Sequence, residues 1–395
     1  MSRSSSTNSR QTDLAITGWG LASAAGDQAF ALLGAVGCGL NLARPDPIFE
    51  APARDGLGAA AIMTCPSLAQ DAEPAERMRL LWQTALDALL DDWTDAPERL
   101  AKMRLILLVP DVTTERGSEL DAGDWPSLIA GRLGHARPEN IEVRPVREDV
   151  TAAWLEVAER LEDETCEGIV LGVVDTLLDP ASLMALAAEH RLLLEGDAEG
   201  FAPGEAAAFV VLERAAAAGP RARARVRAIA RLPEPEHGRI GETRLNALSQ
   251  AIGLAATEAG ATAGDIDCLC ATVAGGPGKE VEWFQAASDL WPVRLDEAER
   301  LAMQNGDTDM PPQPPPAPEA ERLDPALLLG ETGHAGLLLS VLCACARFDF
   351  TWPAVRNVLV AELPDAPWRG ALWLEAVTKA GEERRSALGY LSTGS

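Results

Sequence analysis

The chain has 395 residues and a mass of 41.8 kDa, and its 47% hydrophobic and 24% charged residues are typical of a globular protein. This composition excludes disordered, collagen-like and membrane-spanning chains. The 34 basic and 60 acidic residues give a net charge of -26, which repels phosphate backbones and anionic lipid surfaces. We therefore expect neither a nucleic-acid partner nor a membrane partner.

The first residues are polar and rich in serine, so they do not resemble a signal peptide, and residues 1–12 are predicted to form a disordered tail. A second tail is predicted over residues 381–395. The 7 cysteines include no C-x-x-C pair, which favours reduced thiols and a cytoplasmic location.

Between the tails, short apolar runs alternate with amphipathic stretches, a pattern that predicts an α/β fold with helices on both faces of a sheet. Apolar runs and helical spacing predict the individual elements. Strands are expected at 14–20, 105–109, 168–174, 206–212, 223–232, 266–273, 356–361 and 371–377, and helices at 27–36, 75–92, 152–161, 180–194, 244–259 and 337–346.

The second half of the chain repeats the order of elements in the first half. We therefore expect a single domain over residues 13–380, made of two pseudo-repeats at about 13–200 and 201–380. A proline-rich run over 303–318 can form neither a helix nor a central strand, and it predicts an exposed loop with polyproline character.

The most specific motif lies at Gly200–Glu205, which reads Gly-Phe-Ala-Pro-Gly-Glu. Together with the opening strand at 14–23 and the segment 164–180, it resembles the β-ketoacyl synthase branch of the thiolase-fold family, over about residues 14–377. The resemblance implies a thiolase-like fold, pseudo-duplicated and built in five αβαβα layers. It also implies a dimer formed by extending the sheets across a two-fold axis, and the apolar strand at 105–109 suggests that an edge needs covering.

The resemblance further implies a cysteine nucleophile and two histidines. The nucleophile position falls near Arg147, and no cysteine lies between Cys65 and Cys166. The first histidine position falls at Thr272, which is a substitution, whereas His334 retains the second histidine. We interpret His334 as a vestigial residue, because no nucleophile accompanies it.

Two further parts of the implied machinery are also changed. The lysine expected shortly before the second histidine is replaced by the apolar run at 327–329. Lysines are rare in this chain, which has only Lys102, Lys279 and Lys379. The Gly-Phe-Gly-Gly loop that closes the oxyanion site is replaced by Leu363–Gly370, which contains two prolines.

These changes predict a catalytically inactive ketosynthase-like protein that serves as a binding partner or scaffold. Its expected partner is a second copy of itself or a related ketosynthase-like subunit. An accessory or adaptor role in a bacterial assembly, such as a secretion apparatus, is a second hypothesis, with the proline-rich run as a docking element. Acidic acyl carrier proteins are disfavoured as direct partners by the charge of -26.

The enzymatic alternative is an acyltransferase or decarboxylase whose chemistry has moved to His334 with Cys343, Cys345 or Glu331. We expect no cofactor and no metal. Cys268 and Cys270 are two residues apart on a strand, and no second chelating pair accompanies them.

Overall fold

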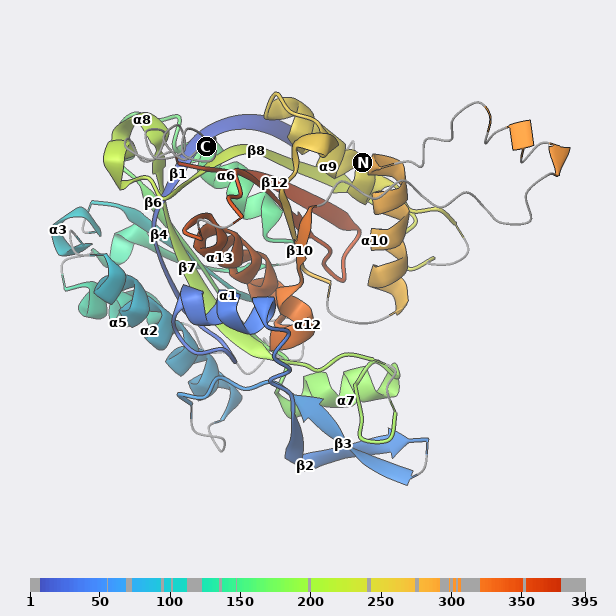
Figure 1. The fold of residues 1–395 in the computed structure, drawn as a ribbon. Helices are drawn as coiled ribbons and strands as arrows, with labels where there is room; N and C mark the ends of the chain where they lie inside the picture. Colours follow the sequence, from blue (N-terminus) through green and yellow to red (C-terminus); the bar gives the residue numbers. More distant parts are fainter. Residues whose placement is uncertain are drawn as a thin grey trace, which may run out of the picture.

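The computed structural model describes residues 8–377, apart from 55, 69–72, 94–95, 101, 112–122, 135–136, 147, 198–199, 240–242, 274–276, 292–297, 299–300, 303–304, 307–319 and 351–352. Ten strands of these residues form one mixed sheet in the order β10-β9-β11-β12-β8-β1-β7-β6-β4-β5 (Figure 1). Their bounds are β1 (Asn8–Ala22), β4 (Arg104–Pro110), β5 (Ile141–Val146), β6 (Ile169–Thr176), β7 (Glu205–Arg214), β8 (Ala224–Pro233), β9 (Cys268–Ala271), β10 (Glu321–Leu323), β11 (Asn357–Glu362) and β12 (Trp368–Ala376).

The strand order contains an internal repeat. The first half reads β5-β4-β6-β7-β1 and the second reads β10-β9-β11-β12-β8, so each strand has a counterpart at the same place. The directions agree as well: β4 is parallel to β5 and β6, as β9 is to β10 and β11, and the remaining pairs within each half are antiparallel. The halves meet where β1 pairs with β8, and the chain passes between them after β7. The division therefore follows residue 214, later than the expected boundary near 200.

Helices cover the sheet on both sides and fill the space between its halves (Figure 1). Apolar side chains of α2 (Pro74–Asp92) and α5 (Trp125–Leu133) pack on the first half, and those of α9 (Ala247–Glu258) and α10 (Pro277–Leu290) pack on the second. Between the halves lie α6 (Thr151–Arg160) and α13 (Gly336–Phe348), within the largest apolar cluster. This arrangement confirms the five-layer αβαβα prediction. The other helices are α1 (Ala29–Gly37), α3 (Ala96–Leu100), α7 (Pro180–Ala188), α8 (Ala215–Ala218) and α12 (Pro325–Leu329).

Several sequence expectations need correction. Strand β1 begins at Asn8, so residues 8–12 belong to the sheet rather than to a disordered tail. The helix predicted over 180–194 ends at Ala188, because His190 adopts the left-handed conformation, with φ 55°. The run at 105–109 is not an edge, since β4 lies between β5 and β6, and β5 is the edge strand on that side of the sheet. The second tail at 381–395 and all of the proline-rich run but residues 305 and 306 lie outside the described residues.

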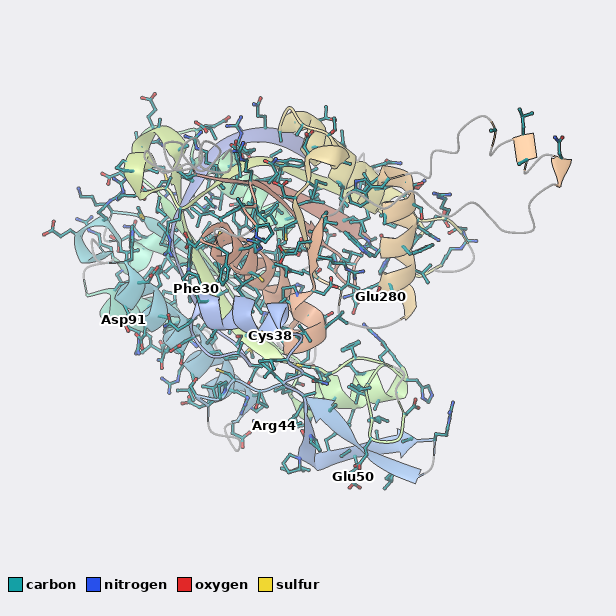
Figure 2. The ribbon with its side chains drawn as sticks, viewed as in Figure 1. Phe30, Cys38, Arg44, Glu50, Asp91 and Glu280 are labelled. Atoms are coloured by element: carbon teal, nitrogen blue, oxygen red, sulfur yellow. The ribbon has the colours of Figure 1, made fainter. Side chains whose placement is uncertain are left out.

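A two-stranded sheet of β2 (Arg44–Ala53) and β3 (Gly56–Ile62) extends beside α7 (Figure 1). Sequence reasoning missed this hairpin, whose first strand contains three prolines and carries the exposed side chains of Arg44 and Glu50 (Figure 2). Among the residues that the structure describes, no helix is both long and apolar enough to cross a bilayer.

Candidate functional site

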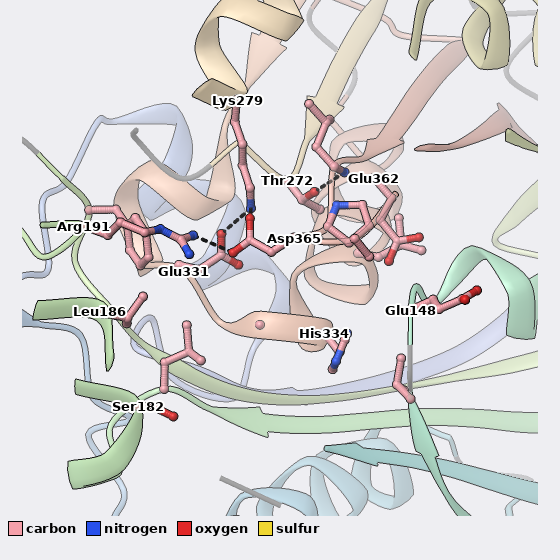
Figure 3. A pocket seen from close by; sticks show the side chains of 18 of the residues that line it. Glu148, Ser182, Leu186, Arg191, Thr272, Lys279, Glu331, His334, Glu362 and Asp365 are labelled. Atoms are coloured by element: carbon pink, nitrogen blue, oxygen red, sulfur yellow. Dashed lines mark hydrogen bonds and ion pairs between the residues drawn. The ribbon is translucent and has the colours of Figure 1, made fainter. Parts of the chain in front are cut away.

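A cavity of about 340 Å³ lies between α7, the start of α13, and the ends of β5 and β11 (Figure 3). Thr272 and His334, which are far apart in the sequence, both line it. Arg147 lies outside the described residues, but its neighbours Val146 and Glu148 line the same cavity. The structure therefore brings together the two histidine positions inferred from the sequence, next to the segment expected to carry the nucleophile.

His334 is held at the cavity by its backbone. It lies in the short turn Gly333–Ala335, directly before α13, and its N–H donates to Asp175 Oδ2 over 2.8 Å. A side chain at position 333 would collide with the Asp175 carboxylate, and the φ of Gly333 is 58°. Glycine is thus required beside His334, which explains the Gly-His pair in the sequence.

Thr272 has a structural role in this cavity. Its hydroxyl oxygen accepts the N–H of Leu363 over 2.9 Å, and its own N–H donates to the carbonyl of Ala361. The first bond holds the loop between β11 and β12, which replaces the glycine-rich loop implied by the resemblance, and the second continues the pairing of β9 with β11. Thr272 therefore fixes the loop through its hydroxyl group, which a histidine at this position would lack.

A buried carboxylate occupies the N-terminus of α6, directly after the predicted nucleophile segment. Glu362, at the end of β11, is 4% exposed. Its Oε1 accepts the N–H of Val150 over 2.8 Å, and its Oε2 accepts the N–H and hydroxyl of Thr151 over 2.8 and 2.5 Å. A side chain at Gly370 would collide with Thr151, so glycine there permits this contact. The donors at this helix end are thus already satisfied within the chain.

The surroundings of Glu362 make it a weak acid. Burial raises the pKa of its carboxyl, the nearby Asp149 charge raises it further, and together they outweigh the bonds from Val150 and Thr151 to give a pKa of about 7. Asp149 is itself held by Arg231, whose Nη2 lies 2.6 Å from Oδ2. Arg231 Nη2 also lies 2.8 Å from Glu148 Oε2, so three carboxylates and one guanidinium gather at the α6 terminus.

Four charged residues from separate segments meet at one side of the cavity (Figure 3). Lys279 Nζ, from α10, lies 2.9 Å from Glu331 Oε2 and 3.7 Å from Asp365 Oδ1. Arg191 Nη2 lies 2.5 Å from Asp365 Oδ2. Burial alone would lower the pKa of Lys279, but the charges of Glu331 and Asp365 outweigh it and raise that pKa. Lys279 therefore remains an ammonium group and cannot serve as an amine nucleophile.

Most of this group of four charged residues, which we call the charged cluster, could not be predicted from the sequence. The sequence predicts a role for Glu331 only as a partner for His334, and no motif marks Arg191 or Asp365. The one available signal was the scarcity of lysine, since Lys279 is the only lysine among the cavity-lining residues of the described chain. It brings an ammonium to Glu331 from α10, whereas the resemblance placed a lysine at 327–329.

The cysteines lie elsewhere. All seven are free, and none is among the described residues that line the cavity. Cys343 and Cys345 lie on α13 with 0% and 1% exposure, and burial raises the pKa of Cys345 to about 12. The thiols proposed for relocated chemistry are therefore buried, and they are not among the described residues that line the cavity with His334. In the described part of the chain, no three His, Cys, Asp or Glu side chains are grouped to hold a metal ion.

No protein-family model matches the sequence, and no curated protein matches it either. Solved structures do match the fold. The ishigamide ketosynthase/chain length factor superposes with a TM-score of 0.65 at 16% identity, covering 93% of this chain and 100% of that chain. The AntDE ketosynthase bound to a hexaketide, in complex with the type II PKS acyl-carrier protein AntF, gives a TM-score of 0.67 at 11% identity, with coverage of 93% and 100%.

A third structure, the ketosynthase ApeO in complex with its chain length factor ApeC from Xenorhabdus doucetiae, gives a TM-score of 0.62 at 12% identity, covering 93% of this chain and 98% of that chain. These similarities extend over nearly the whole length of both partners in each comparison. The chain therefore has the thiolase-like fold of the ketosynthases and chain length factors.

Proposed function

We propose that this protein is a ketosynthase-like partner subunit without condensing activity. The observation that carries the proposal is the Glu362 carboxylate on the N-terminus of α6. A condensing enzyme needs a thiolate at a helix N-terminus and free N–H donors for the developing oxyanion. Here a resident carboxylate accepts the N–H groups of Val150 and Thr151.

Two further observations support the proposal. The position of the first histidine holds Thr272, whose hydroxyl is used to fix the Leu363 loop. No cysteine lines the cavity among the described residues. Since the thiol, the histidines and the oxyanion donors act as a unit, the loss of several members leaves little of the rate enhancement.

The sheet offers a surface for a partner subunit. Strand β5 is an edge, with β4 on one side and no strand among the described residues on the other. If two copies of β5 pair antiparallel about Val143, Glu142 of each copy lies opposite Arg144 of the other, which places opposite charges together. Two of the similar structures are ketosynthases described together with chain length factors. We infer that this chain pairs through β5 with a second copy or with a related ketosynthase-like subunit.

Loss of condensing chemistry predicts that the chain does not take up an acyl group. After incubation with acyl-pantetheine thioesters of several lengths, the intact mass should remain that of the unmodified chain. A ketosynthase that forms an acyl-enzyme serves as the positive control. A stoichiometric mass increase that maps to a cavity residue and is absent in His334→Ala would contradict the proposal and support relocated acyltransferase chemistry.

Pairing through β5 predicts a mass near twice 41.8 kDa by light scattering at micromolar concentration. In Arg144→Glu, the new glutamate of each copy lies opposite Glu142 of the other copy. These two pairs of like charges should raise the dissociation constant of the dimer about tenfold. Arg137→Glu is the matched control, because Arg137 is 77% exposed outside the strand. A mass of 41.8 kDa for the wild type would exclude the homodimer and leave a related subunit as the inferred partner.

A further inference from the structure

The outermost contact of the four charged residues joins two separate segments that line the cavity. Arg191 follows α7, and Asp365 lies in the loop between β11 and β12 (Figure 3). Their side chains are 33% and 55% exposed, whereas those of Lys279 and Glu331 are 16% and 10% exposed. The Arg191–Asp365 pair therefore faces solvent, and the Lys279–Glu331 pair lies deeper.

The loop that carries Asp365 is fixed at both ends. Pro364 and Pro367 restrict its backbone, and the carbonyl of Pro367 accepts the N–H of Glu234. At the other end, Leu363 is bonded to Thr272. Burial would raise the pKa of Asp365, but the charges of Lys279 and Arg191 outweigh it and lower that pKa to about 2. Asp365 is thus a stationary, ionised acceptor.

Arg191 has two further contacts besides Asp365. Its guanidinium lies 5.2 Å from the ring centroid of Phe201, and its Nη1 lies 3.1 Å from Glu189 Oε2. A rotamer change of this one side chain breaks the bridge to Asp365 without moving the loop, and such changes are fast in exposed residues. Behind the pair, the cavity wall includes the apolar side chains of Leu186 and Leu337.

We propose that Arg191 and Asp365 form a strap across the mouth of the cavity, and that a molecule enters only when this ion pair breaks. The strap regulates access whether or not the cavity has lost condensing chemistry. Because both side chains are partly exposed, the pair is weak, so high salt or a charged group on a ligand is enough to open it.

The strap can be tested with a thiol placed inside the cavity. His334→Cys, in a Cys38→Ser background that removes the exposed native thiol, provides a reporter on the cavity wall. The rate of its modification by N-ethylmaleimide is followed by mass spectrometry of the reporter peptide. Asp365→Asn and Arg191→Gln should each increase that rate about threefold to fivefold, the range set by a partly exposed ion pair.

Two controls complete the experiment. Asp87→Asn removes a comparably exposed pair with Arg132 away from the cavity, and it should leave the reporter's rate unchanged. Sodium chloride at about 1 M should accelerate the strap-intact reporter by a similar factor and have no effect on Asp365→Asn. The salt measurement on the strap-intact reporter needs no substitution in the strap, so it tests the proposal even if a strap variant misfolds. Equal rates in all variants and at both salt concentrations would show that the mouth is open and would overturn the proposal.

Discussion

Replacing Arg77 with methionine is expected to lower the free energy of unfolding by about 3–5 kcal/mol. Arg77 on α2 and Glu205 at the start of β7 form an ion pair in the core, where they are 5% and 0% exposed. Arg77 Nη2 donates to Glu205 Oε1 over 2.7 Å, and the same oxygen accepts the N–H of Cys65. Removing the guanidinium leaves a carboxylate buried without its counter-ion, which is why the expected loss is large.

Chemical denaturation of the wild type and the variant measures this loss. The double variant Arg77→Met with Glu205→Gln should lose less than the single variant, because it leaves no uncompensated charge. Asp87→Asn, which breaks the exposed pair with Arg132, should cost less than about 1 kcal/mol. A single-variant loss no greater than that of Asp87→Asn would show that the buried pair does not stabilise the fold.

The second large effect is a pH dependence that Glu362 imposes on stability. The pKa of this carboxyl is raised from 4.5 to about 7 in the folded protein. Because ionisation is harder in the folded state, Glu362 has no destabilising effect below pH 4.5, and its penalty grows as the pH rises to 7. The penalty above pH 7 is on the order of 3 kcal/mol.

The measurement is the difference in unfolding free energy between the wild type and Glu362→Gln from pH 4.5 to 8. The variant loses the N–H acceptor for Thr151, but that loss is the same at every pH, so only the slope reports the titration. Relative to the variant, the wild type should lose stability as the pH rises. Glu139→Gln, at a side chain that is 68% exposed, is the matched surface control. A flat difference for Glu362→Gln would show that the carboxylate is fully stabilised by its donors.

The elements with strong apolar patterns could be predicted from the sequence, whereas edge elements could not. The run in β6 is entirely buried, so its pattern is unbroken, and it was predicted within two residues. Strand β5 was missed because it contains Glu142, Arg144 and Pro145, which edge strands tolerate but propensity disfavours. The repeat of the two halves is visible in the strand order, but the amino-acid sequences of the two halves show no matching pattern of residues.

The site was predicted only as far as motifs extend. Gly333 and His334 belong to a local motif, and Thr272 was located by spacing from neighbouring segments. The four residues of the charged cluster lie at positions 191, 279, 331 and 365, so only the folded chain brings them together. The role of Glu362 was equally hidden, because its bonds reach across more than two hundred residues to the start of α6.

The most direct test of the proposed loss of activity is turnover of acyl and malonyl pantetheine thioesters, measured as release of condensed product. Neither the wild type nor Arg147→Cys should exceed the uncatalysed rate. The added thiol would still lack the first histidine at Thr272, and Glu362 would still occupy the N-terminus of α6. Wild-type turnover well above the uncatalysed rate that is abolished by His334→Ala would contradict the account and establish this chain as an enzyme.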